Sequence, residues 1–203
     1  MPDPDLAESI SGRATGVLFF AGFGSLWLCT GLASCHRLGA VTGAGIALVL
    51  ILLAVPAVLL LRRTARLRAP DEPGTGSDSA PLESAEQARI RRVFGRVNAA
   101  QWIAIFLAVA LLNLLHHPEY IVPAVATIVG LHLFPLARLF RYPLHHLTGA
   151  ALVLWSASVV LFLPRSGLAS YGALGTAAIL LLSAGYTLRS AQRAFRGLSG
   201  RNP

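Results

Sequence analysis

The sequence predicts an all-α membrane protein whose chain crosses the bilayer six times. Of its 203 residues, 55% are hydrophobic and only 13% are charged, whereas about 25% of the residues in a soluble domain are charged. Six apolar stretches of roughly 17–24 residues each match the ~30 Å of bilayer hydrocarbon at ~1.5 Å per helical residue. Because lipid leaves no other partner for backbone polar groups, these stretches are expected to be helices.

The apolar stretches fall into three consecutive pairs, each joined by a short turn. We predict three transmembrane hairpins from these pairs, at 15–61, 97–140 and 147–188. Within them, the predicted spans cover residues 15–34, 38–61, 97–115, 120–140, 147–163 and 171–188.

Three polar segments flank the hairpins. Residues 1–14 are acidic and are predicted to be a flexible tail, and residues 189–203 form a basic tail. The segment 62–96 is rich in arginine, and its part 69–81 combines Pro, Gly, Ser and Asp, a composition that predicts disorder. The remainder of that segment, 82–96, is predicted to be a surface helix that leads directly into the third span.

The basic residues are all arginines, and their distribution predicts the orientation. If both termini are cytoplasmic, fifteen of the 17 lie inside and only Arg37 and Arg165 lie outside. This bias favours an N-in, C-in topology in a bacterial inner (plasma) membrane. It also accounts for the net charge of +8, so nucleic acid is not a predicted partner. The predicted partner is the bilayer, with the arginine-rich segment 62–96 contacting anionic lipid.

An internal repeat is predicted from the even-numbered spans. Pro56 and Pro135 each lie six residues before an arginine, and Ser183 occupies the same place in the last span. A small residue precedes each of these three positions by eleven residues. The pattern indicates three repeated helical hairpins.

Two short motifs near the first turn have alternative interpretations. Residues 32–35, Leu-Ala-Ser-Cys, have the form of a lipoprotein cleavage site. The acidic residues before them favour an uncleaved transmembrane helix, since signal peptides begin with positive charge. Gly39 and Gly43 would allow a helix to approach closely. We expect that contact within the chain, with a homo-oligomer as the alternative.

A polar stripe on the third span marks the best candidate site. Asn98, Gln101, Asn113 and His116 fall within about a third of the helix circumference. His132 on the fourth span lies ~10–12 Å from the cytoplasmic end, a depth similar to that of Gln101. The predicted cavity residues are Asn98, Gln101, Asn113, His132, Arg138 and Thr148. Alternatively, His132 bonds to Gln101 or Asn98 and only fixes helix packing.

A second polar cluster is expected at the outer mouth. It comprises His36, His116, His117 and Glu119. Their spacing matches no metal-binding motif, so these residues are expected to be interfacial caps, and neither a metal nor a cofactor is predicted. The sequence also has no nucleotide-binding loop and no pair of intramembrane carboxylates. Catalysis by two carboxylates and a carboxylate-driven pump are therefore disfavoured.

The segment 130–140, with the sequence GLHLFPLARLF, resembles a group of uncharacterised membrane proteins. These are small multi-pass proteins of actinobacteria with a Gly-Leu-His-x-x-Pro-Leu-Ala segment, and the similarity extends from about Phe94 to about Leu154. The resemblance implies a multi-pass fold and draws attention to His132, but it implies no activity.

Three classes of function follow. The first is a small-molecule or ion permease, or a permease subunit, with a polar cavity between the third and fourth spans. The second is a non-catalytic regulatory or scaffold module. The third, less favoured, is a small intramembrane enzyme that acts on a lipid-like substrate, with His132 as acid or base.

Overall fold

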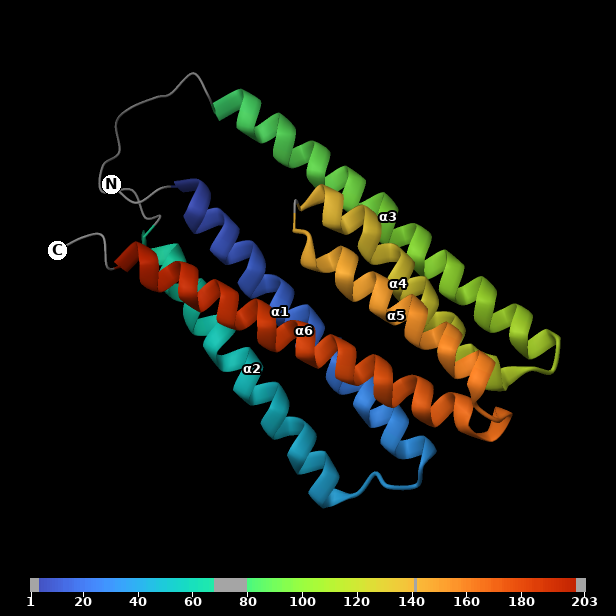
Figure 1. The fold of residues 1–203 in the computed structure, drawn as a ribbon. Helices are drawn as coiled ribbons and strands as arrows, with labels where there is room; N and C mark the ends of the chain where they lie inside the picture. The colour runs from blue at the N-terminus through green and yellow to red at the C-terminus, as the bar shows by residue number, and fades with distance from the viewer. Residues whose placement is uncertain (1–3, 68–79, 141, 200–203) are drawn as a thin grey trace. The chain divides into compact units, whose positions relative to one another are not determined.

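All secondary structure in the described part of the chain is helical. The computed structural model describes residues 4–67, 80–140 and 142–199 (Figure 1). The long helices are α1 (Pro4–Ser34), α2 (Ala40–Leu67), α3 (Ala80–Leu114), α4 (Ile121–Leu139), α5 (Leu144–Phe162) and α6 (Leu168–Ser199). Two short 3₁₀ helices, η1 (Pro118–Tyr120) and η2 (Arg165–Gly167), precede α4 and α6. Each long helix is long and apolar enough to cross a membrane, which confirms the predicted six-helix membrane fold.

Several helices extend beyond the predicted apolar spans. α1 begins at Pro4, inside the segment predicted to be a tail, and α2 continues to Leu67 through three arginines. α3 unites the predicted surface helix 82–96 and the third span. Of the segment predicted to be disordered, residues 69–79 lie outside the described residues. Hydropathy marks the part of a helix that can lie in hydrocarbon, whereas backbone hydrogen bonding continues into the polar ends.

The chain divides into two compact units. One contains α1, α2 and α6 from Ala173 onward, and we call it the α1/α2/α6 unit. The other, residues 70–172, contains α3, α4 and α5 with the first turn of α6 and is called the α3/α4/α5 unit. α6 therefore begins in one unit and continues in the other.

In the α1/α2/α6 unit, glycines allow α1 to pack closely on α6. A Cβ atom on Gly31 would lie 2.7 Å from Leu174, and one on Gly24 would lie 2.9 Å from Leu181. Nearer the termini, a buried cluster joins all three helices: Ile10, Ala14, Leu60 and Ala191. By contrast, no heavy atom of the described residues lies within 4 Å of a Cβ built on Gly39 or Gly43.

In the α3/α4/α5 unit, α4 lies between α3 and α5. Gly130 of α4 and Gly149 of α5 bring their two backbones into contact. On the other side, the ring of Phe94 on α3 packs against Phe140, just beyond α4, at a centroid distance of 6.0 Å. Thr148 and Leu152 are buried on α5.

α1 and α3 end in the same way. The amide of Arg37 donates to the Leu32 carbonyl at 2.8 Å, and the amide of His117 donates to the Leu112 carbonyl, also at 2.8 Å. In each case a histidine just before that amide has a positive φ, 54° at His36 and 58° at His116. This is the Schellman arrangement, in which glycine normally occupies the left-handed position. Both chain reversals thus place a strained histidine at the end of a membrane helix.

Candidate functional site at the α3–α4 interface

His132 lies within the apolar part of α4, and its side chain approaches α3. Its side chain is half-buried, and its ring lies near the backbone of Val97 on α3, close enough for a favourable polar interaction. A titratable side chain within a membrane helix costs free energy unless it is paired or hydrated. The backbone of Val97 offers the ring a polar neighbour at the helix interface.

Two of the predicted cavity residues lie close to Val97 on α3. Asn98 follows Val97 directly, and Gln101 is one helical turn further, on the same face of the helix as Val97. Both side chains are half-buried. The structure thus brings the His132 ring to the part of the α3 stripe that contains Gln101.

The other predicted cavity residues are Asn113, Arg138 and Thr148. Asn113 is exposed, and its side-chain amide donates to the carbonyl of Val109 on the same helix at 2.8 Å. It lies ~18 Å along α3 from Gln101 at ~1.5 Å per residue. Arg138 is exposed, whereas Thr148 is buried on α5. Of the predicted polar stripe on α3, Asn98 and Gln101 are half-buried, whereas Asn113 and His116 are exposed.

Proline changes the backbone beside His132. Pro135 lies within α4, and a proline has no amide hydrogen to donate to the carbonyl four residues earlier. That carbonyl belongs to Leu131, the residue before His132. The polar groups at this level are therefore the imidazole, the Gln101 amide and a backbone carbonyl released from the helix ladder.

The predicted outer-mouth residues are partly brought together. The Glu119 carboxylate lies 3.3 Å from Nδ1 of His117 and 3.7 Å from a guanidinium nitrogen of Arg165. The His117 ring also packs edge-on against Tyr120. His116 is exposed at its strained position, and His36 lies in the α1/α2/α6 unit. Within the described ranges, no three His, Cys, Asp or Glu side chains gather as a metal site would require.

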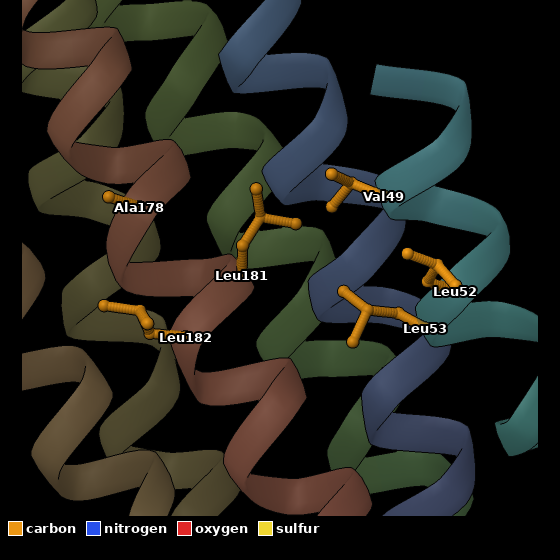
Figure 2. Close-up of a pocket in the computed structure, with 6 residues that line it drawn as sticks. All are labelled: Val49, Leu52, Leu53, Ala178, Leu181 and Leu182. Carbon is orange, nitrogen blue, oxygen red and sulfur yellow. The ribbon is translucent and has the colours of Figure 1, made fainter. Parts of the chain in front are cut away.

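Two surface hollows lie in the α1/α2/α6 unit, which contains none of the predicted cavity residues. One is a groove of about 490 Å³ between α2 and α6, shown in Figure 2. Its lining is entirely aliphatic: Val49, Leu52, Leu53, Ala178, Leu181 and Leu182. The other hollow, of about 220 Å³, runs along α1 from Leu18 to Leu26.

Three features of the structure were not predicted from the sequence. Gly130 and Gly149 carry the α4–α5 contact, and Arg165 reaches Glu119 from η2. An isolated glycine inside an apolar helix is a signal for close packing, so the two glycines could have been singled out. The Arg165 contact and the α2–α6 groove depend on which helices are neighbours, and a single sequence does not give that information.

Comparisons with known proteins give one match. No curated protein and no solved structure matches the chain. A family model matches residues 84–189, and its description is "Family of unknown function (DUF7010)". The match runs from α3 into α6 and contains the whole GLHLFPLARLF segment, and it leaves the hairpin of α1 and α2 outside. Because the matched residues make up just over half of the chain, the protein belongs to this uncharacterised family, DUF7010.

Proposed function

We propose that the protein is a permease for a small polar solute or an ion, or a subunit of one, and that His132 lines the route. The observation that carries this proposal is the half-buried imidazole on α4, whose ring lies near the backbone of Val97 on α3. An ionisable side chain inside a membrane helix usually faces a water-filled cavity or another helix. Gln101 lies one helical turn beyond Val97 on the same face of α3, and the Leu131 carbonyl lies next to His132 in the chain, so these groups offer donors and acceptors to a hydrated solute.

The test is whether water reaches position 132, and it does not require a known substrate. In a background with Cys29→Ala and Cys35→Ser, the variant His132→Cys is treated in membranes with a membrane-impermeant cationic methanethiosulfonate. Thiolate, the reactive form, forms in water and is suppressed in apolar surroundings. We expect the cysteine at 132 to be modified.

The matched control is the neighbouring variant Leu131→Cys. The Leu131 side chain is 54% exposed, so it is sterically more open than His132, but it faces lipid if the helix is membrane-embedded. We expect no modification at 131. If the cysteine at 132 is as unreactive as the one at 131, no aqueous route passes His132 and the permease proposal fails.

A non-catalytic regulatory or scaffold module is the second candidate. The observation that favours it is the accumulation of exposed arginines at the C-terminal ends of α2 and α6, a surface suited to anionic lipid.

An intramembrane enzyme that uses His132 as acid or base is the third candidate. It also requires position 132 to be reachable, but from the lipid rather than from water, so the labelling experiment separates it from the permease.

The proposed setting is a bacterial inner membrane with both termini in the cytoplasm. The arginine bias supports this orientation. The matching chain reversals after α1 and α3 are consistent with a repeated hairpin, since both end with a left-handed histidine. A homo-oligomer also stays a proposal, supported by the open space around Gly39 and Gly43.

A further inference from the structure

The groove between α2 and α6 is an open, apolar hollow on the surface of the α1/α2/α6 unit. In Figure 2, Leu181 of α6 points toward α2, and Val49 and Leu53 of α2 point toward α6, whereas Ala178 and Leu182 extend from the other side of the α6 ribbon in this view. The groove has a volume of about 490 Å³. A groove of aliphatic side chains on a membrane helix pair suits a hydrocarbon chain.

Arginines continue the same two helix faces beyond the groove. Successive residues of an α-helix are turned by ~100° around its axis. By this rule, Arg63 points within about 40° of the mean direction of the groove-lining residues of α2. Arg189 likewise points within about 40° of the mean direction of the groove-lining residues of α6. Arg62, next to Arg63, points about 130° away. Arg63 lies ~15 Å beyond Leu53, and Arg189 lies ~10 Å beyond Leu182, at ~1.5 Å per residue.

The two arginines lie close to a point where the helices pack together. Leu60 of α2 and Ala191 of α6 share one buried cluster. Arg63 follows Leu60 by three residues, and Arg189 precedes Ala191 by two. Both arginine side chains are exposed. The two arginines therefore lie near the same level of α2 and α6, although Arg189 points about 160° away from Ala191 around its helix.

The charges among the described side chains around these arginines are of one sign. Among the side chains described in the α1/α2/α6 unit, residues 9–66 and 173–197, there is no aspartate or glutamate. The same ranges contain arginines at the N-terminal end of α1 and the C-terminal ends of α2 and α6: Arg13, Arg62, Arg63, Arg66, Arg189, Arg193 and Arg196. Such a group attracts an anion over several ångströms.

We propose that the groove is a binding site for one anionic phospholipid. One acyl chain lies between Val49–Leu53 and Ala178–Leu182, and the headgroup phosphate lies between Arg63 and Arg189. The spacing supports this, because ~10–15 Å is the depth of one bilayer leaflet's hydrocarbon. Guanidinium groups pair with phosphate oxygens through two parallel hydrogen bonds. The site is independent of the route at His132.

The experiment measures lipid binding to the purified full-length protein in a neutral detergent. Native mass spectrometry is used to titrate phosphatidylglycerol and, separately, phosphatidylcholine. We expect tighter binding of phosphatidylglycerol. The double variant Arg63→Ala/Arg189→Ala should weaken that binding roughly 30-fold, since an arginine near an anionic headgroup is worth about 1 kcal/mol and each 1.4 kcal/mol is tenfold.

Two further variants make the result specific. Arg62→Ala/Arg66→Ala removes the same charge from α2 residues that lie off the groove face, and we expect a much smaller loss. Ala178→Phe fills the groove at an exposed position and should weaken phosphatidylglycerol binding without changing the charge. Melting curves without lipid verify that each variant is folded.

Three outcomes would overturn the proposal. Equal binding of the two lipids would show that charge plays no part. Equal losses in the two double variants would show a diffuse charge effect rather than a site. If excess inorganic phosphate displaces the lipid and Ala178→Phe has no effect, the arginines bind a free anion and the groove is not part of the site. None of these outcomes bears on labelling at position 132, so this proposal and the permease proposal can fail separately.

Discussion

The backbones of α4 and α5 are in direct contact at Gly130 and Gly149. A Cβ atom on Gly149 would lie 2.6 Å from the carbonyl oxygen of Gly130, and a Cβ on Gly130 would lie 2.9 Å from the carbonyl oxygen of Gly149. Real Cβ atoms do not approach carbonyl oxygens so closely. Neither backbone can yield by a rotamer change, so both positions require glycine as long as this helix contact is kept.

Gly149→Ala is therefore expected to destabilise the protein. Overpacking a well-packed interface typically costs about 1–3 kcal/mol, and here the clash is with backbone. The matched control is Gly185→Ala on α6, where the new methyl group would have no neighbour within 4 Å. Alanine favours a helix by roughly 0.5–1 kcal/mol over glycine, so the control should be neutral or stabilising. Thermal unfolding in detergent measures both, and equal melting temperatures would contradict the close contact.

At the left-handed histidine after α3, glycine is expected to stabilise the protein rather than destabilise it. His116 has a φ of 58°, a conformation that costs an ordinary residue roughly 1 kcal/mol and costs glycine nothing. His116→Gly should therefore raise the free energy of unfolding by about 1 kcal/mol relative to His116→Ala. Melting temperatures of the two variants test this. The result would be contradicted if alanine were as stable as glycine, because the strain would then be absent.

A hydrogen bond joins the start of α1 to the end of α6. The guanidinium of Arg13 donates to the Ser190 hydroxyl at 3.1 Å across a partly buried contact. Ser190→Ala removes the acceptor and should lower the free energy of unfolding by about 1 kcal/mol. Ser158→Ala is the control, because that hydroxyl is exposed and donates only to the Leu154 carbonyl of its own helix. Denaturation in mixed micelles should show a loss for Ser190→Ala alone, and equal losses would contradict a stabilising bond.

The sequence predicted local features of this fold better than contacts between helices. Each predicted span lies within or close to one observed helix, because helix formation in lipid depends on local hydropathy. The helical spacing of α3 puts Asn98 next to Val97 and Gln101 one turn beyond it, while the predicted cavity itself stays a prediction. The same spacing could not show that Asn113 is exposed, since exposure depends on how far the neighbouring helices extend. The glycine contact between α4 and α5 likewise depends on registers that a single sequence does not specify.

The orientation of the helices is the last prediction. With N-in, C-in topology, η2 lies outside and the C-terminal end of α2 lies inside. Ser166 in η2 and Ala65 near the end of α2 are both exposed. In the cysteine-free background, Ser166→Cys should react with an impermeant maleimide in intact spheroplasts, and Ala65→Cys should react only after permeabilisation. The physical reason is the high cost of moving an arginine-rich segment across the membrane.

The two positions serve as controls for each other, because both should react fully once the membrane is permeabilised. Reaction at Ala65→Cys but not at Ser166→Cys in intact spheroplasts would reverse the topology. It would also transfer the arginine ends of α2 and α6 to the outer leaflet, where the proposed phospholipid site would draw on outer-leaflet lipid. Since the groove and its arginines lie on the same helix pair in either orientation, the site would remain, and only the leaflet that supplies the lipid would change.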